Sequence, residues 1–351
     1  MIKKNWIALV AGLFFSLSSF AQIGGDNTYE FLSLPVSART TALGGTLISV
    51  KDYDAALGFA NPALLNPSMH QALTFSTSLH LAGINFGYAG YAHHIDKWNT
   101  TVNGGIQYIS YGNFTAADLN GQVVGEFKAS EFAMAFGGGY QYSETLSFGA
   151  NVKLLYSSLE SYNSFGLASD LAVTYADTSS KFSASLVFRN AGFQISHYTE
   201  DTREPLPFDV QAAFSKQLKY LPLRFTVTAH NLHRWDIRYD DPNAEEPTAL
   251  FGDPTSTESG FSQFVDNFFR HLIFSGELLL GRNEVFQIRF GYNHLRRAEL
   301  NVDNTRSLAG FSGGFGLKIK RFRIGYGLGM HHLAGGTNHF TISTGLNEFK
   351  R

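Results

Sequence analysis

The sequence predicts an all-β protein: a transmembrane antiparallel up-and-down β-barrel of about fourteen strands with an N-terminal plug segment in its lumen. Two observations predict this class. From about residue 71 onward, segments alternate polar and apolar residues with a period of two, as half-buried strands do. The expected connections are alternately short and long, which is typical of a bacterial outer-membrane barrel. Because lipid cannot hydrogen-bond an open strand edge, such strands span a membrane only as a closed barrel.

The alternation is clearest in Leu223–His230, Phe286–Asn293 and Phe322–Met330, where every second residue is apolar. Parity also places a set of charged residues on the polar faces of the strands. These are Lys153, Asp170, Arg224, Glu277, Arg289 and Arg323. A lumen tolerates charge, whereas Arg or Lys at the bilayer midplane costs about 2–4 kcal/mol, so the polar faces should line the lumen.

The expected connections fall into two interleaved groups. Short turns are expected on the periplasmic side, at 95–98, 142–145, 176–180, 218–222, 281–284 and 319–321. Long loops are expected outside the cell, at 111–128, 157–163, 190–207, 235–267 and 295–305. This arrangement is the one that outer-membrane barrels adopt.

Residues 1–21 are interpreted as a secretory signal peptide. Lys3 and Lys4 precede an apolar stretch at 6–15, and small residues precede a cleavage site before Gln22. An uncleaved anchor is the alternative, although the stretch is short for a membrane-spanning helix. Export through a cleaved signal peptide and a barrel fold together predict a location in the bacterial outer membrane.

Composition supports the barrel and excludes some functions. The chain has 32 Phe, 16 Tyr and 35 Gly, and only 16% of its residues are charged. A barrel can place many aromatic residues toward lipid and at the two membrane interfaces. The absence of Cys excludes disulfides and thiol chemistry, and a net charge of −2 argues against a nucleic-acid partner.

Residues 22–70 do not fit the strand pattern, because several prolines interrupt them. We expect them to fold into the lumen as a plug, with the barrel occupying 71–351; a periplasmic tail is the alternative. The plug motif residues are Arg39, Gly44, Gly45, Asn61 and Pro62. Asn before Pro favours a turn, which leaves two readings open: a gating hinge or a permanent kink.

The charged residues of the plug lead to a further prediction, that they form ion pairs. Arg39, Asp52 and Asp54 would lie among the charged residues of the lumen wall. Because a buried charge without a partner is expensive, each should pair with an opposite charge.

Candidate catalytic and metal-binding motifs are weak. Gly310–Gly314 matches the G-x-S-x-G nucleophile pattern, but that motif needs a strand-to-helix elbow and no helix is expected after it. The pairs His93–His94 and His331–His332 cannot chelate one ion as pairs, because adjacent strand residues point to opposite faces. We therefore expect neither an enzyme nor a metal site, and no cofactor.

The segment 235–267 carries eight carboxylates against a single arginine. Loops of this length are usually functional or disordered. Three readings stay open: a solvated acidic loop, a docking surface for a partner protein, and Ca²⁺ binding by clustered carboxylates. The candidate docking residues are Asp240, Asp241, Glu245, Glu246, Leu250, Phe251, Asp253, Glu258, Phe261 and Phe264.

Four segments carry a resemblance to a known family. They are Gln22–Thr46, Asp54–Pro67, Ile106–Phe114 and Gly149–Tyr175, of which the first two hold the pattern SAR…LGG…NPA. In these segments the chain resembles the PorQ family of the type IX secretion system of Bacteroidota. That family belongs to a wider group of fourteen-stranded barrels, which includes PorV and the FadL long-chain fatty-acid transporters.

The resemblance implies a non-enzymatic subunit that anchors a PorZ-like surface protein. It also implies PorU and PorV in the same attachment complex, which joins cargo to lipopolysaccharide. The alternative function is a FadL-type channel for a long-chain fatty acid or another hydrophobic small molecule. A channel would need a continuous apolar path, whereas the predicted lumen face is polar and charged.

Overall fold

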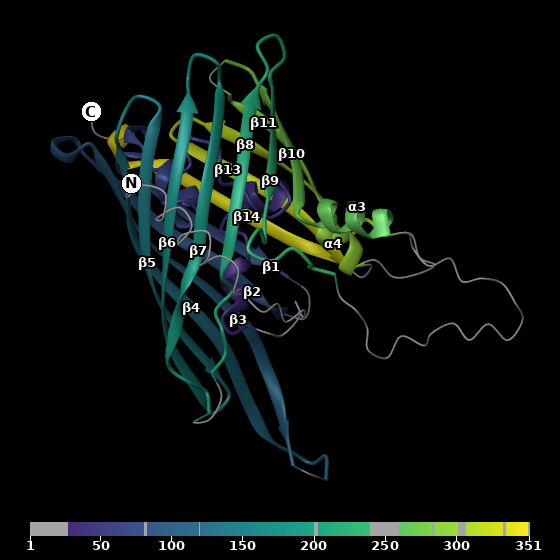
Figure 1. Cartoon of the computed structure of the whole chain (residues 1–351). Coiled ribbons are helices and arrows are strands. Elements are labelled where there is room, and N and C mark those ends of the chain that lie inside the picture. The colour runs from purple at the N-terminus through teal and green to yellow at the C-terminus, as the bar shows by residue number, and fades with distance from the viewer. Residues whose placement is uncertain are drawn as a thin grey trace, which may run out of the picture.

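The computed structural model describes residues 27–80, 83–118, 120–199, 203–238, 260–282, 284–300, 307–332 and 335–349. Their fourteen strands form one closed barrel in which each strand pairs with its neighbours in sequence and β1 pairs antiparallel with β14 (Figure 1). The fold-class prediction is confirmed. The strands are β1 Ala72–Leu79, β2 Asn85–Ile95, β3 Thr100–Ala117, β4 Val123–Gln141, β5 Leu146–Leu159, β6 Tyr162–Asp177, β7 Phe182–Ser196, β8 Asp209–Gln217, β9 Leu223–Ala229, β10 Leu272–Leu280, β11 Phe286–Asn293, β12 Phe311–Ile319, β13 Phe322–His332 and β14 Gly335–Gly345.

Side chains alternate across the barrel wall as the sequence predicts. In β11, Gln287 and Arg289 are buried in the lumen, whereas Ile288 and Phe290 are exposed on the outer surface. This arrangement puts polar groups inside and aromatic groups outside, the reverse of a water-soluble barrel. None of the helices among the described residues is long and apolar enough to cross a membrane.

The strands differ greatly in length. The hairpin β3–β4 has strands of 18 and 19 residues, whereas β8 to β12 have seven to nine residues each. Figure 1 shows this hairpin extending well beyond the rest of the barrel. We call the end with the connections after β2, β4, β6, β8, β10 and β12 the short-turn end, and the opposite end the hairpin end.

The prediction of a long loop is wrong for two segments. Residues 111–128 and 157–163 are mainly strand, because the β3–β4 and β5–β6 ladders continue almost to their turns. In the first, Phe114 and Phe127 stack across the strands with ring centroids 5.1 Å apart. Such cross-strand aromatic pairs stabilise a sheet even where Gly and Asn suggest a loop.

Residues 27–70 fill the lumen as a plug of short helical turns. These are η1 Glu30–Ser33, α2 Ala38–Ala42, η2 Ala55–Phe59, η3 Pro62–Leu64 and η4 Pro67–Met69. The largest fully buried side chains of the molecule are mostly theirs, including Phe31, Leu47 and Phe59. The hydrophobic core is therefore the plug and its contacts with the wall, and a periplasmic tail is excluded for these residues.

In the described part of the chain, four further helical segments lie outside the plug. They are η6 Asp96–Trp98, α3 Gly260–Arg270, α4 His294–Glu299 and η7 Leu346–Phe349. The first and last lie at the short-turn end, and α3 and α4 lie at the hairpin end beside the short strands (Figure 1). The signal-peptide segment 1–21 lies outside the described residues.

Candidate functional site: the plug and its ion cluster

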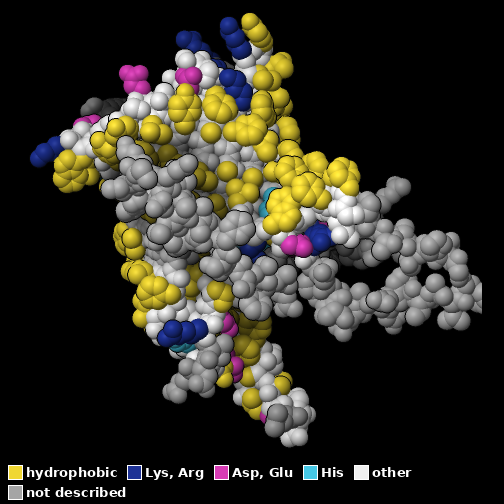
Figure 2. All heavy atoms as spheres, viewed as in Figure 1, with side chains coloured by type: hydrophobic (Ala, Val, Ile, Leu, Met, Phe, Trp, Pro, Cys, Tyr) yellow, Lys and Arg dark blue, Asp and Glu magenta, His cyan; other side chains and the backbone are white. Residues whose placement is uncertain are grey.

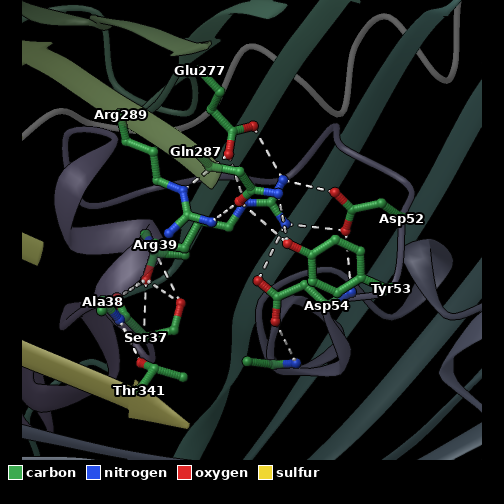
Figure 3. Close-up of polar contacts among 12 residues, drawn as sticks. Ser37, Ala38, Arg39, Asp52, Tyr53, Asp54, Glu277, Gln287, Arg289 and Thr341 are labelled. Atoms are coloured by element: carbon green, nitrogen blue, oxygen red, sulfur yellow. Dashed lines mark hydrogen bonds and ion pairs between the residues drawn. The ribbon is translucent and has the colours of Figure 1, made fainter. Parts of the chain in front are cut away.

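Arg39 is the central cation of the plug. It lies on α2, which begins with a capping box in which Ser37 and Thr40 satisfy each other's backbone amides. The backbone N–H of Ala38 donates to the Thr341 hydroxyl of β14 at 2.8 Å, which ties this helix to the wall (Figure 3). These contacts fix the direction in which the guanidinium points into the lumen.

The guanidinium of Arg39 contacts three carboxylates at once (Figure 3). Its Nη2 lies 2.7 Å from Asp52 Oδ2 and its Nη1 lies 3.3 Å from Asp54 Oδ2, both within the plug. Its Nε lies 2.9 Å from Oε1 of Glu277, on β10 of the wall. The Arg39 side chain is 4% exposed, so these contacts are shielded from water and salt.

Two wall arginines complete the cluster around Glu277. Arg224 on β9 lies 2.7 Å from Glu277 Oε2, and Arg289 on β11 lies 3.2 Å from Glu277 Oε1. Arg289 also donates to Gln287, whose amide in turn donates to the Tyr53 hydroxyl of the plug at 3.0 Å. Plug and wall therefore share one continuous network of charged hydrogen bonds.

The two plug carboxyls differ in their acidity. Burial raises the pKa of Asp52, but Arg39 and Arg224 outweigh burial and leave this pKa below its ordinary value. Burial also raises the pKa of Asp54, and its contact with Arg39 does not offset the increase. Burial lowers the pKa of Arg39, yet Asp52 and Glu277 hold it well above its ordinary value. On acidification, Asp54 is therefore protonated before Asp52.

A second buried ion pair lies in the same lumen. Lys153 on β5 and Asp170 on β6 are 2.8 Å apart and both side chains are fully buried. The Lys153 ammonium also lies over the Phe59 ring of the plug, 4.7 Å from its centroid. The predicted charge pairing of the plug with the wall is confirmed for Arg39, and through it for Asp52 and Asp54.

The predicted motif residues Gly44 and Gly45 form the turn after α2. Both have positive φ, +87° and +99°, which L-residues with a side chain rarely adopt. A Cβ at Gly44 would lie 2.4 Å from Ile273 Cγ2 on β10, and one at Gly45 would meet the Arg296 guanidinium. The turn thus brings the plug backbone directly against the wall.

Asn61 and Pro62 lie at the start of η3, which contacts β4, β5 and β6. Asn61 caps η3 and its amide donates to Ile48 O at 2.6 Å and to Thr174 Oγ1 at 3.2 Å. Pro62 packs onto Gly149, where a Cβ would approach it to 2.3 Å. Between the two readings left open, this packing favours a permanent kink over a hinge.

The sequence analysis named the motif Gly310–Gly314 but did not predict that its serine holds the plug. Ser312, the centre of the G-x-S-x-G match, donates to Ala42 O and accepts from Gly44 N, both at 3.0 Å. A Cβ at neighbouring Gly314 would lie 2.8 Å from that of Ala42, so this glycine gives the plug room. The motif is a contact between strand β12 and the plug, with no helix after it.

Tyr53 was also missed. The Arg323 guanidinium stacks on its ring 3.9 Å from the centroid, and both line a cavity of about 40 Å³ near the short-turn end. An aromatic residue between two aspartates in a predicted plug was the available signal for this position.

The structure describes only two of the candidate docking residues. Asp240, Asp241, Glu245, Glu246, Leu250, Phe251, Asp253 and Glu258 lie outside the described residues. Phe261 and Phe264 belong to helix α3 and not to a loop. Among the described residues, no group of three or more His, Asp or Glu side chains is arranged to hold a metal ion.

Comparisons with known proteins bear on the fold. No protein-family profile and no curated protein matches the chain. The toluene transporter TodX of P. putida is similar, with a TM-score of 0.50 and 13% identity over 90% of this chain and 99% of TodX. A TodX deltaS2S3 mutant, a monoaromatic hydrocarbon channel, has a TM-score of 0.50 and 13% identity over 88% and 97% of the two chains.

A Pseudomonas aeruginosa FadL homologue has a TM-score of 0.47 and 8% identity over 88% of this chain and 97% of its own. At 13% identity, the likeness of this chain to TodX holds at the level of the fold.

Proposed function

We propose that this chain is a non-enzymatic outer-membrane barrel that anchors a surface protein, by resemblance a PorZ-like subunit of the type IX secretion system. The observation that carries the proposal is the plug: it fills the lumen and is bound to the wall through the Arg39–Glu277 contact. A barrel that is closed and held in this way serves as a fixed support in the membrane. Its hairpin end then presents loops to a partner.

Cavity size supports an anchor over an open channel. The cavity at Arg39 and Tyr53 has a volume of about 40 Å³, and one between Pro35 and Leu47 has about 10 Å³. Two others that plug residues line, at Lys51 and at Ser68, have about 210 and 160 Å³. Pockets that bind small molecules usually have volumes of about 300–1,000 Å³. Moving helix α2 out of the lumen would break the Arg39–Glu277 ion pair, which leaves buried charges and is costly.

A FadL-type channel for a hydrophobic compound is the second candidate, and the comparisons favour it, since TodX is a transporter with the same fold. One pocket also favours it. A pocket of about 480 Å³ lies beside the hairpin-end half of β7, where Phe193, Ile195 and Pro205 line it. Its volume suits a small ligand, and these three residues form an apolar part beside the polar side chains of His197, Arg203 and Glu204.

Deletion of the acidic segment tests the anchoring function. Replacing Glu245–Ser259 with a short Gly-Ser linker should release the PorZ-like partner from cells into the culture fluid. Replacing Asp240, Asp241, Glu245 and Glu246 by their amides separates charge from length. The matched control replaces residues 118–121 at the tip of the β3–β4 hairpin, and heat-modifiability on gels verifies folding of every variant. Retention of the partner by a folded deletion variant would contradict docking at this segment.

Transport measurements test the second function. The purified barrel in lipid vesicles should admit neither toluene nor a long-chain fatty acid faster than vesicles without protein. Saturable uptake that is abolished by Phe193→Asp would instead identify a channel. If the wild-type protein binds its partner and transports neither compound, the channel function is excluded.

A further inference from the structure

Helix α3, Gly260–Arg270, is strongly amphipathic. Its apolar residues fall on one face, with the spacing i, i+3, i+4, i+7 and i+8 that places them side by side on a helix. They are Phe261, Phe264, Val265, Phe268 and Phe269. The opposite face carries Gln263, Asp266, Asn267 and Arg270.

The polar face of α3 is the one that packs against the protein. Asn267 is 3% exposed; its amide donates to Trp235 O and its Oδ1 accepts from Ile237 N. Asp266 forms an ion pair with Arg270 at 2.7 Å and contacts His294 of α4 at 3.3 Å. A surface helix of a water-soluble protein has the opposite orientation, with its apolar face against the core.

The apolar face is therefore turned outward. Phe261 is 77% exposed and Phe264 is 53% exposed, and Phe268 and Phe269 are also exposed. Figure 2 shows hydrophobic side chains gathered over the side of the barrel that carries α3. Aromatic side chains grouped in this way mark a surface that another apolar phase covers.

This face is continuous with the lipid-facing surface of the barrel. The ring of Phe269 lies 6.5 Å from that of Phe274 on β10, which is directly opposite Tyr292 on β11. Tyr292 in turn contacts Phe311 on β12, with centroids 4.9 Å apart. Phe274 and Phe311 are exposed on the outer wall, where aromatic residues form the girdle at a membrane interface.

We propose that α3 is an interfacial helix whose phenylalanines insert into the acyl-chain layer of the leaflet at the hairpin end, which is the outer leaflet in the predicted topology. Amphipathic helices with aromatic and aliphatic faces lie in the plane of the membrane in this way. Phe261 and Phe264 then bind lipid and not a partner protein. This role goes beyond the anchoring function and does not rest on it.

Quenching by brominated lipid tests the proposal. The chain has no Cys, so Phe261→Cys and Phe268→Cys can each carry one fluorophore. Phe290→Cys, on the outer face of β11, is the lipid-exposed control. Asn120→Cys, at the tip of the β3–β4 hairpin, is the water-exposed control. All four are reconstituted in phosphatidylcholine vesicles with or without bromine on the acyl chains, after heat-modifiability has verified folding.

Labels at 261 and 268 should be quenched by brominated lipid to an extent similar to the label at 290, while the label at 120 should not respond. Two results would overturn the proposal. The first is that the α3 labels behave like the label at 120. The second is that they are shielded from aqueous iodide but are not quenched by brominated lipid, which would indicate a protein cover.

Discussion

Arg39 is the residue at which plug and wall are most strongly coupled. Its three carboxylate partners come from two plug positions and from one strand, so no single element can move without losing an ion pair. Because the side chains of Arg39 and Glu277 are only 4% and 2% exposed, each lost contact leaves a buried charge. The side chain therefore determines whether the plug stays docked.

Replacement of this side chain should be costly. Arg39→Gln should lower the free energy of unfolding by about 3–5 kcal/mol, because it leaves Asp52, Asp54 and Glu277 short of a partner. Urea unfolding in detergent, followed by Trp fluorescence, measures the loss, and trypsin should cleave the plug faster.

Arg282→Gln is the matched control, since Arg282 lies exposed in the turn after β10. The double variant Arg39→Gln with Asp54→Asn should recover part of the loss, because the ion pair of Asp54 is with Arg39 and the second change neutralises the carboxylate that Arg39→Gln strands. Equal stabilities of Arg39→Gln and Arg282→Gln would show that the ion cluster does not hold the plug.

The pairing of Arg39 was predictable only in part. Burial in a plug requires opposite charges for Arg39, Asp52 and Asp54, and that argument needs no coordinates. Which wall residue meets Arg39 depends on the barrel register, which places Glu277 opposite Arg224 and Arg289. No short-range pattern encodes that register, so the partner could not be named from the sequence.

Among the elements, the turn at Gly44 and Gly45 brings the plug backbone close to the wall. Its amide and carbonyl groups contact Ser312 and Asn293 on two strands. Positive φ and close approach coincide there, so two separate constraints require glycine.

A substitution at this turn should therefore lower the free energy of unfolding by more than backbone strain alone would. Gly44→Ala should destabilise the protein by about 2–5 kcal/mol, from strain at positive φ together with overpacking against Ile273. Gly121→Ala is the matched control, because Gly121 has φ +78° but nothing within 4 Å of its Cβ position. Thermal unfolding of both variants gives the comparison. Similar losses for the two would exclude overpacking against the wall.

Element prediction succeeded where polarity alternates over the bilayer and failed beyond it. The strands β9, β11 and β13 follow a period of two, and the structure has them close to the predicted bounds. Beyond these stretches, the sequence predicts a long loop at 111–128, where the structure has most of the tip of the β3–β4 hairpin. The sequence also predicts a loop at 235–267, whose last residues belong to helix α3, although Phe261, Phe264 and Phe268 have helical spacing.

At the scale of the whole molecule, strand order fixes which connections share a side of the membrane. A closed antiparallel barrel alternates its connections between two ends, so the β3–β4 tip and the β9–β10 connection lie at one end and the β4–β5 turn lies at the other. The cell-surface side follows from the rule that long connections face outward.

Cysteine labelling of intact cells tests this orientation. An impermeant maleimide should label Asn120→Cys and Leu250→Cys, and should label Glu144→Cys only after the outer membrane is permeabilised. The native chain has no Cys, so the background is low. Labelling at 144 without labelling at 120 or 250 would invert the topology.

The unequal strand lengths have a consequence for the lipid around the barrel. A nine-residue strand such as β10 is about 30 Å long, and at a tilt of about 40° it spans about 23 Å, slightly less than an apolar band of about 25 Å. The seven-residue β9 spans less still, whereas β4 exceeds the band by far. Hydrophobic mismatch of this kind is relieved by compressing the membrane.

We therefore expect the bilayer to be thinned along one flank of the barrel, beside β8 to β12, and to keep its normal thickness along the other. Electron microscopy of the protein in nanodiscs would show the asymmetry as a dip in the headgroup density. Lipids with short acyl chains would collect at that flank, which would give an otherwise round barrel a preferred side for neighbours in the membrane.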